Sequence, residues 1–597
     1  MSLSRLLALL LPIALAVLTF SRPQESSRQP VVLIDRVYGE PGSRVTVTVL
    51  LEGMRDVRSV TVRLLRGAEP LYRVSTPAAP QVNVTLTLPE AEGLYAVEVL
   101  ANISEAAVLG RVVEPLPVVR VDAWGEPLLV CFVWHNHQGV NIMPDGTFHG
   151  PWAFVHVYES QFAPYYPEGA YSLHATLLEK HPRVRATINW SPSLLWQWLY
   201  ALRFGYYDGL RRVQVPPDSR EVAVVRALLE RLRSLAAGGR MEVLTSYFNH
   251  PIPGYVAEKF EWGLEALEEE LEWGLTVTKL AFNTTPRGAW IPEMFFSMKL
   301  TPMLVSHGIQ YTVLDARYHL SSARGDVATP YEPYLLESGG SKLAVFFRDS
   351  EISDFISFGI NPRDHAEADA LARRVAALIV SRRLEHPEAR VVVIAADGEN
   401  WLFGNSLKAV FLDKLYGYVT GSEPVLEAAT LSEALQRAQP RRILSWIPTN
   451  SWAGGDWVWT SRSENAAQWS MIAEAGRKYA EVKRACPDPG IRAAAAFSLF
   501  MALNSDVIHI EYTMLQHTHT WSTQVEMICR LGAKEAEKLL QKHFTPNLER
   551  INVHTDCRAC APSLADYLPQ ITVGLLLIAA AVLVARARKR RGNPDEK

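Results

Sequence analysis

Net charge and cysteine are both scarce in this chain of 597 residues. Its 60 Lys and Arg nearly balance its 63 Asp and Glu, which leaves a formal net charge of −3. A charge balance this close to neutral does not favour a nucleic-acid partner. A hydrophobic content of 48% argues against a largely disordered chain. The length exceeds what one hydrophobic core supports, so we expect two or three domains.

The chain contains five cysteines, which are only a weak indication of its location. Cys131 lies in an apolar run, where it packs as a small hydrophobic residue. Cys557 and Cys560 are separated by two residues, a spacing that suits either a local disulfide or a redox pair. The sequence leaves these two alternatives open.

An apolar run with a basic residue before it lies near the start of the chain. Arg5 precedes Leu6–Phe20, which is short for a membrane span. This pattern predicts an export signal over residues 1–22, either cleaved as a signal peptide or kept as a signal anchor.

A second apolar run lies near the end of the chain. Ile571–Ala585 contains one polar side chain, Thr572, and five basic residues follow it closely. The pattern predicts a transmembrane helix over residues 568–587 and a basic cytoplasmic tail over 588–597; the alternative is a buried core helix. We therefore expect a single-pass protein of the cell membrane whose bulk lies outside the cytoplasm.

Residues 31–121 alternate polar and apolar side chains with the two-residue period of β-strands, as in Arg44–Leu51 and Val82–Leu88. Short strands separated by Gly, Pro and Asn predict a β-sandwich. No group of reactive side chains occurs here, so a structural module is favoured over a sugar-binding accessory domain.

From residue 127 to residue 404 the pattern changes to continuous apolar runs, which are typical of parallel strands buried on both faces. Seven occur: Leu128–Trp134, Val184–Asn189, Met241–Leu244, Gly288–Ile291, Ile309–Leu314, Leu343–Phe347 and Val391–Ala396. Helical segments fall between most of them: Tyr171–Lys180, Glu221–Ala237, Val256–Val277 and His365–Leu384. This alternation predicts an α/β fold, a (β/α)7-type barrel.

Beyond the barrel, residues 405–545 are mostly helical and predict a subdomain that completes the site. Its expected helices are Ser432–Arg437, Asn465–Ala485, Ile491–Leu503 and Thr523–Lys542. Residues 546–567 read as a linker.

Polar, acidic and aromatic residues follow the predicted strands, where a parallel barrel carries its reactive groups. His135 and His137 end the first strand, Glu293 follows the fourth and Asp397 the seventh. Two carboxylates in an aromatic cleft are the equipment for glycoside hydrolysis, one as nucleophile or base and one as acid.

The acid needs a raised pKa, which burial near Trp401 or a neighbouring carboxylate such as Glu399 would supply. Other interpretations exist for each motif. Pro292-Glu293 also suits a helix start, Asp397-Gly398 a turn, and His137 a core histidine. Their occurrence at successive strand ends favours a site.

Five short segments make the chain resemble glycoside hydrolase family 57, over roughly residues 127–530. They are His135-Asn-His-Gln138, Glu242-Val-Leu-Thr through His250-Pro, Gly288-Ala-Trp-Ile-Pro-Glu293, Asp397-Gly-Glu-Asn400 and Asn504-Ser-Asp506. The Asp-Gly-Glu-Asn form, with Ser451-Trp452, Glu464-Asn465 and Trp469, is closest to amylopullulanase-like and α-amylase-like members. Two departures are Gly139, where the family usually has Pro, and Val-Ile-His-Ile-Glu511, where amylopullulanase-like members have aromatics.

The resemblance implies a retaining enzyme for α-linked glucans, with Glu293 as catalytic nucleophile and Asp397 as general acid/base. It implies an innermost subsite lined by His135, His137, Glu242, Trp290 and Asp506, with no metal or other cofactor needed. We add Trp401, four residues after Asp397, to the expected substrate-binding residues. The expected partners are a polysaccharide or oligosaccharide and, through the C-terminal helix, a membrane.

Three other functions stay open at this point. A 4-α-glucanotransferase or branching-type transglycosylase would share the covalent intermediate and pass it to a sugar instead of water. A zinc-dependent carbohydrate esterase would use His135 and His137 with Asp397 or His250 as ligands. A surface glycan-binding protein would have lost catalysis, against which the presence of both carboxylates argues.

Overall fold

The structure is a computed structural model that describes residues 29–511, 513–560, 572, 576 and 579–583. Within these residues, no helix combines the length and the apolar character needed to cross a membrane. The predicted export signal over 1–22 and the basic tail over 588–597 lie outside the described residues. The predicted span over 568–587 also lies outside them, apart from seven positions. The described chain forms two compact units, each of which is presented by itself.

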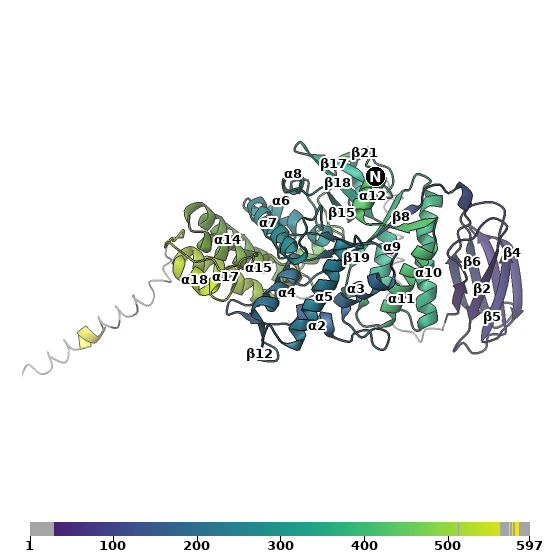
Figure 1. Cartoon of the computed structure of the whole chain (residues 1–597), viewed down its shortest axis with the longest axis horizontal. Helices are drawn as coiled ribbons and strands as arrows, with labels where there is room; N and C mark the ends of the chain where they lie inside the picture. The colour runs from purple at the N-terminus through teal and green to yellow at the C-terminus, as the bar shows by residue number, and fades with distance from the viewer. Residues whose placement is uncertain (1–28, 512, 561–571, 573–575, 577–578, 584–597) are drawn as a thin grey trace, which may run out of the picture. The chain divides into compact units, whose positions relative to one another are not determined.

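Two antiparallel sheets form the N-terminal β-sandwich of the first unit (Figure 1). One sheet has the order β1–β2–β5 and the other β4–β3–β6–β7. Their bounds are β1 Val31–Ile34, β2 Arg44–Leu50, β3 Ser59–Arg66, β4 Glu69–Pro77, β5 Gln81–Thr87, β6 Ala96–Asn102 and β7 Val108–Pro115. Val45, Val47 and Val49 of β2 are fully buried while the residues between them are partly exposed, as the two-residue period predicts.

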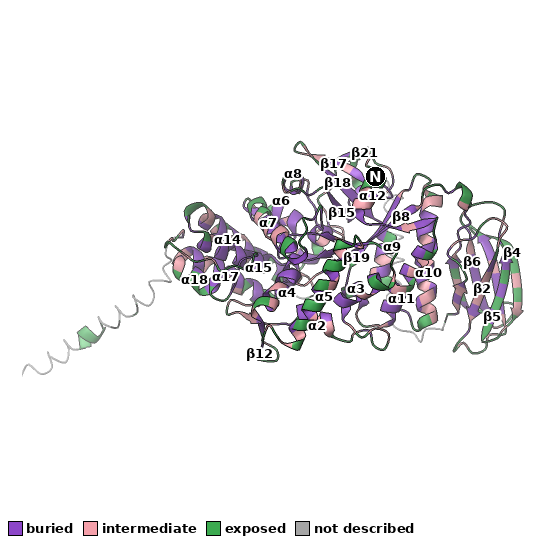
Figure 2. Ribbon diagram, viewed as in Figure 1, coloured by how far each residue is buried: buried purple, intermediate pink, exposed green. Residues whose placement is uncertain are grey.

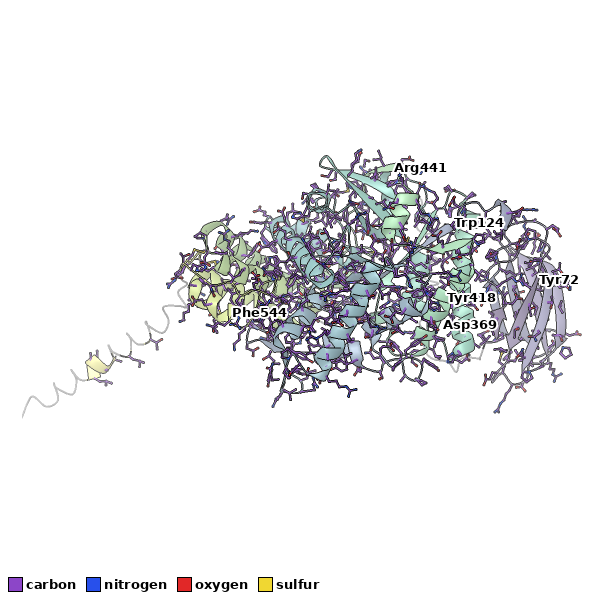
Figure 3. The ribbon with its side chains drawn as sticks, viewed as in Figure 1. Tyr72, Trp124, Asp369, Tyr418, Arg441 and Phe544 are labelled. Carbon is purple, nitrogen blue, oxygen red and sulfur yellow. A yellow bond between two sulfur atoms is a disulfide. The ribbon has the colours of Figure 1, made fainter. Side chains whose placement is uncertain are left out.

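Two helices belong to the same unit as the sandwich, α10 (His365–Glu385) and α11 (Leu407–Gly421). The buried guanidinium of Arg373 on α10 donates to the backbone oxygens of Arg36, Val37 and Pro115. Tyr418 of α11 donates to Asp369 of α10 at 3.1 Å (Figure 3). The sandwich therefore shares its unit with α10, which lies within the predicted barrel, and with α11, which lies within the predicted helical subdomain.

The second unit contains a closed ring of seven parallel strands (Figure 1). The strands are β8 Leu128–Asn136, β10 Ala186–Trp190, β13 Met241–Leu244, β14 Gly288–Ala289, β15 Tyr311–Asp315, β18 Ser341–Arg348 and β19 Val391–Asp397. Hydrogen-bonded pairs join neighbours around the ring, and a parallel bridge between Thr245 and Ala289 joins β13 to β14. All seven predicted strands occur, with bounds shifted by a few residues.

Burial on both faces explains why these strands read as continuous apolar runs. Every residue of β8 is buried, and Figure 2 shows this strand in the colour of buried residues. The joint between β18 and β19 rests on a single residue pair, Arg348 and Val393. The earlier part of β18 does not pair with β19, because on that side it pairs with the antiparallel strand β17 (Tyr334–Ser338).

Four longer helices form the helical subdomain: α14 Ser463–Ala485, α15 Pro489–Leu503, α17 Leu515–Leu531 and α18 Ala533–Leu540. The predicted single helix Thr523–Lys542 is wrong, because Gly532 interrupts it at φ 57°. A Cβ at this position would lie 2.1 Å from the carbonyl oxygen of Cys557, so the break accommodates the returning chain. The predicted helix Val256–Val277 is likewise two helices, α6 Pro253–Lys259 and α7 Gly263–Phe282.

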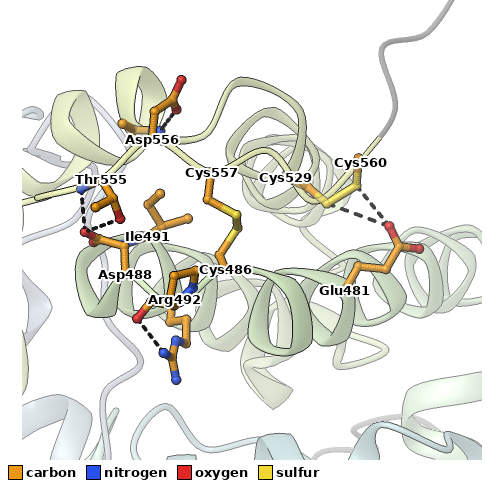
Figure 4. The surroundings of a disulfide bond; sticks show 12 residues. Glu481, Cys486, Asp488, Ile491, Arg492, Cys529, Thr555, Asp556, Cys557 and Cys560 are labelled. Carbon is orange, nitrogen blue, oxygen red and sulfur yellow. Dashed lines mark hydrogen bonds between the residues drawn. A yellow bond between two sulfur atoms is a disulfide. The ribbon is translucent and has the colours of Figure 1, made fainter.

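Two disulfides fasten the segment before residue 561 to this subdomain (Figure 4). Cys557 bonds to Cys486 at the end of α14, and Cys560 bonds to Cys529 in α17. Neither alternative of a local disulfide or a redox pair between Cys557 and Cys560 is realised. Asp488 holds the same segment by accepting from the backbone NH groups of His554 and Thr555, at 2.7 and 3.0 Å. Cys131 is buried and free, as predicted.

Candidate active site

A cavity of about 720 Å³ gathers most of the predicted site residues. The predicted residues that line it are His135, His137, Trp290, Glu293, Asp397, Trp401 and Asp506. They come from the ends of β8 and β19, the segment after β14, and the short helix α16 (Ser505–Ile508). All belong to the barrel unit, and they meet because parallel strands present their carboxyl ends at one edge of the barrel.

Glu293 lies in a strained turn directly after β14. Its φ of 57° and the φ of 46° at Met294 place two successive residues in the left-handed region, which costs a non-glycine residue about 1–3 kcal/mol. His250, another residue of the cavity wall, has φ 56°. Strain of this kind concentrates at functional sites, where the surrounding structure holds a side chain in one required direction.

Two hydrogen-bonding groups reach the Glu293 carboxyl, whose side chain is 15% exposed. The indole Nε1 of Trp452 donates to Oε2 at 2.8 Å, and Ser505 Oγ lies 2.8 Å from Oε1. Burial raises the pKa of Glu293 to about 7, and the hydrogen bond that Trp452 donates opposes this rise. Near neutral pH this carboxyl therefore exists in both its acid and its ionised form.

Asp397 is the last residue of β19 and projects into the cavity. The next residue, Gly398, donates its NH to the His135 carbonyl at 2.6 Å. A Cβ on Gly398 would lie 2.4 Å from Asn136 Oδ1, so this close approach requires glycine. Asp397 is open to the cavity space but enclosed by protein elsewhere, and this burial raises its pKa, although a hydrogen bond from Asn400 opposes the effect.

Glu399 is a third carboxyl at the cavity, and it accepts from the His137 NH at 3.3 Å. Burial first, and then the charge of Asp397, raise the pKa of Glu399 well above its usual range. Of the two causes predicted for the raised pKa of Asp397, burial dominates. The charge of Glu399 is not among the main causes of the pKa shift at Asp397.

Three imidazoles form a stack along the cavity wall. Ring centroids lie 3.8 Å apart for His137 and His250, and 4.8 Å apart for His135 and His250. Burial lowers the pKa of His135 to about 3 and lowers the pKa of His250 well below its usual range. Both are therefore neutral, and each ring carries one proton.

Asp506 pairs with the third imidazole, because its Oδ2 lies 3.0 Å from His137 Nε2. Burial alone would raise the pKa of Asp506, but the attraction and hydrogen bond of His137 outweigh it, and the pKa is lowered. Asp506 thus supplies a negative charge to the cavity near neutral pH.

The ring nitrogens of His135, His137 and His250 approach within 4.8 Å of one another, as a metal site would require. Both nitrogens of His135 and both of His250 already have protein partners, and His137 Nε2 pairs with Asp506. Only His137 Nδ1 lacks a partner within the described residues. One available nitrogen does not make a zinc site, so these residues are treated as hydrogen-bonding groups.

Glu242, which was predicted to line the innermost subsite, is not among the residues that line this cavity. It is the second residue of β13, below the carboxyl edge of the ring. Its carboxylate accepts from Thr187 Oγ1 and the Ser432 NH, both at 3.0 Å, and from the hydroxyls of Tyr311 and Ser432. The motif begins with Glu242, but the loop that follows the strand brings His250 to the cavity instead.

Ser505 and Trp452 were not among the predicted site residues, and His250 was predicted only as a possible zinc ligand, yet each of the three contacts Glu293 or its neighbours. All three lie in or beside segments that the sequence analysis quoted. Spacing along the chain does not show which residue of a motif points toward Glu293, so the sequence alone could not identify these contacts. Phe358 was also missed; it lines the cavity, is 74% exposed, and lies 6.3 Å from the Trp452 ring.

The chain contains a seven-stranded parallel barrel with an acidic, aromatic cavity at the carboxyl ends of its strands. These features place it among the α/β-barrel proteins that carry two carboxylates at this edge of the barrel. Within that class, the chain belongs to glycosyl hydrolase family 57, whose family model matches residues 131–448, just over half of the chain. The predicted family resemblance is confirmed.

Curated relatives include two enzymes from hyperthermophilic genera. The alpha-amylase of Pyrococcus furiosus is 24% identical over 366 residues, which cover 60% of this chain and 45% of that enzyme. The 4-alpha-glucanotransferase of Thermococcus kodakarensis is 24% identical over 357 residues, which cover 58% and 43%. The matched region thus spans less than half the length of these relatives.

Solved structures resemble the fold. The family 57 branching enzyme of Thermococcus kodakaraensis superposes with a TM-score of 0.52 at 16% identity, covering 73% of this chain and 100% of that one. The alpha-amylase AmyC of Thermotoga maritima has a TM-score of 0.50 at 15% identity, with the same coverage. At these identities the likeness shows the fold alone.

Proposed function

We propose that the chain is a retaining glycoside hydrolase for α-linked glucans, with Glu293 as nucleophile and Asp397 as general acid/base. One observation carries the proposal: both carboxyl groups line a single cavity at the strand ends, and burial raises the pKa of each. The names of the curated relatives, alpha-amylase and 4-alpha-glucanotransferase, support a glucan as substrate.

The proposed reaction has two steps. The Glu293 carboxylate attacks the anomeric carbon while Asp397 gives its proton to the departing glycosidic oxygen, so the C–O bond breaks and a glycosyl ester forms. The Asp397 carboxylate then takes a proton from water, whose oxygen attacks the same carbon and releases Glu293. The productive form therefore has Glu293 ionised and Asp397 protonated.

The remaining wall residues suit a sugar. Asp506 and His137 provide an acceptor and a donor for hydroxyl groups. The rings of Trp290, Trp401 and Trp452 offer apolar faces at the same cavity, and sugar rings stack on such faces.

The test incubates the protein with soluble starch, pullulan and a maltooligosaccharide, beside Glu293→Gln, with and without EDTA. The proposal expects short glucans from the parent, resistance to EDTA, and no release by the variant. Intact substrates under conditions where the protein is folded would remove the α-glucan assignment. Loss of activity with EDTA would direct attention to the zinc-dependent esterase alternative.

Transglycosylation is the second candidate function, and one observation favours it. Phe358 is exposed at the cavity and lies beside Trp452, the donor to Glu293. An acceptor sugar stacked on this ring would compete with water for the glycosyl ester. Products longer than a supplied maltooligosaccharide would establish this activity, and its absence would leave hydrolysis.

We also propose that the protein is displayed on the outer face of a cell membrane. The apolar runs at 6–20 and 571–585 and the basic cluster after the second run support this location. The two disulfides support it as well, because such bonds persist in oxidising compartments. Protease treatment of intact cells should digest the barrel; protection from the protease would contradict the proposal.

A further inference from the structure

An unbroken series of hydrogen bonds starts at Asn189, passes through His135 and His250 of the cavity wall, and ends at Glu293. Asn189 Oδ1 lies 2.8 Å from His135 Nδ1, His135 Nε2 lies 2.9 Å from His250 Nε2, and His250 Nδ1 lies 2.8 Å from Ser505 Oγ. Ser505 Oγ lies 2.8 Å from Glu293 Oε1. We call these five residues the Glu293 relay.

The direction of every bond in the relay follows from its far end. The Asn189 amide nitrogen donates to the carbonyl oxygens of Leu244 and Thr245, at 3.1 and 3.2 Å. Carbonyls cannot donate, so the amide oxygen must face His135, whose Nδ1 then carries the proton. His135 is neutral, so its Nε2 accepts a proton that His250 Nε2 donates.

The same counting continues to the carboxyl group. His250 is neutral and carries its proton on Nε2, so its Nδ1 accepts from Ser505. A serine hydroxyl has one proton, and Ser505 therefore has none to give to Glu293. The remaining 2.8 Å bond needs a proton from Glu293 itself.

We propose that the Glu293 relay holds Glu293 as the protonated acid in the empty cavity, with Ser505 and His250 acting as positioning residues. The inference rests on the proposed role of Glu293 and names what controls its ionisation. Among the neighbouring carboxylates, Asp506 of α16 and then Asp397 of β19 raise the pKa of Glu293. Both are acidic and also favour the neutral form.

Ionisation can follow two routes through the relay. If Glu293 loses its proton to water and Ser505 turns toward it, each later bond reverses, and His135 Nδ1 and Asn189 Oδ1 meet as two acceptors. Alternatively, the protons on Glu293, Ser505 and His250 each move one bond along, which leaves a carboxylate at Glu293 and an imidazolium at His135. The second route satisfies every bond and moves no proton to water, and the His135 cation would lie 4.7 Å from the Trp290 ring.

The decisive variant is His250→Phe, which keeps an aromatic ring in the stack but removes both ring nitrogens. Among the described residues, Ser505 Oγ then has Glu293 as its one remaining side-chain partner and donates to it, so the carboxylate gains a hydrogen bond. The expected result is a fall of about one unit in the pH at which Glu293 is half ionised. A matched control is His543→Phe, at a buried histidine outside the cavity wall, which should leave this pH unchanged.

The measurement is an infrared titration of the carboxylic C=O band, assigned to Glu293 by its loss in Glu293→Gln. A rise in the half-ionisation pH of His250→Phe would mean that His250 stabilises the carboxylate as a cation, and would overturn the proposal. An unchanged pH would overturn it equally. No glucan turnover is needed, so the result is independent of whether the proposed function holds.

A second measurement needs no relay variant in case His250→Phe fails to fold. Nitrogen-15 NMR of histidine-labelled protein reports which ring nitrogen carries the proton. The relay requires the Nδ1–H tautomer at His135 and the Nε2–H tautomer at His250. The opposite tautomers, or zinc bound stoichiometrically through these rings, would contradict it.

Discussion

Glu242 and Glu293 are both glutamates of the same barrel, and their surroundings differ in kind. Three residues contribute four donor groups to Glu242, in a regular strand. Glu293 has one fixed donor in Trp452, a shared hydroxyl in Ser505, and a left-handed backbone. A fully satisfied carboxylate stabilises the fold, whereas an undersatisfied one in a strained turn is available for chemistry. The same substitution, Glu→Gln, should therefore have opposite consequences at the two positions.

The largest effect is expected on turnover in Glu293→Gln. The amide cannot form the glycosyl ester, so kcat should fall on the order of 10⁴-fold or more, measured as reducing sugar released from starch. A kcat within tenfold of that of the parent would contradict the assignment of Glu293 as nucleophile, and the functional difference between Glu293 and Glu242 would no longer hold.

The next effect is a dependence of stability on pH. The folded protein raises the pKa of Glu293 from 4.5 to about 7, so its contribution to stability is complete below pH 4.5 and is lost as the pH rises through 7. Gln carries no charge, so the stability of Glu293→Gln should rise relative to that of the parent, by up to about 3 kcal/mol at pH 8. Denaturant unfolding at pH 4.5 and pH 8 measures it. If the difference in the free energy of unfolding between Glu293→Gln and the parent did not change with pH, Glu293 would not be held neutral.

Glu242→Gln should behave in the opposite way. The amide replaces one acceptor oxygen with a donor that faces other donors, which costs about 1–3 kcal/mol of stability. Denaturant unfolding should show this loss, while kcat per folded molecule stays near that of the parent because Glu242 lies away from the cavity. A large fall in kcat without a loss of stability would return Glu242 to the active site.

The smallest effect is expected at the cavity mouth, in Phe358→Ala. Losing one stacking face should raise KM by a factor of about 2–10, since an aromatic contact contributes about 0.5–1.5 kcal/mol. The value of kcat for hydrolysis should change little. Initial rates across a range of maltooligosaccharide concentrations separate the two terms, and an unchanged KM would exclude Phe358 from substrate binding.

Much of the barrel could be predicted because burial on both faces leaves a continuous apolar run, as in β8. The same reasoning placed Glu293 and Asp397 at one edge, since parallel strands all end there. It did not show that Glu242 lies outside the cavity lining, because a motif that spans a strand and its loop does not show which residue points inward. It also failed for the helix that Gly532 interrupts, where the cause is the carbonyl of Cys557, 25 residues further along the chain.

The two disulfides have a mechanical consequence. The chain beyond residue 560 leaves from a segment that is bonded covalently to α14 through Cys486 and to α17 through Cys529. A force that pulls on the chain beyond that point would pass through the disulfide bonds into the helical subdomain. The covalent bonds, and not the hydrogen bonds of the segment, would then bear the force. The barrel and its cavity would then be shielded from tension that would otherwise peel the last residues from the fold.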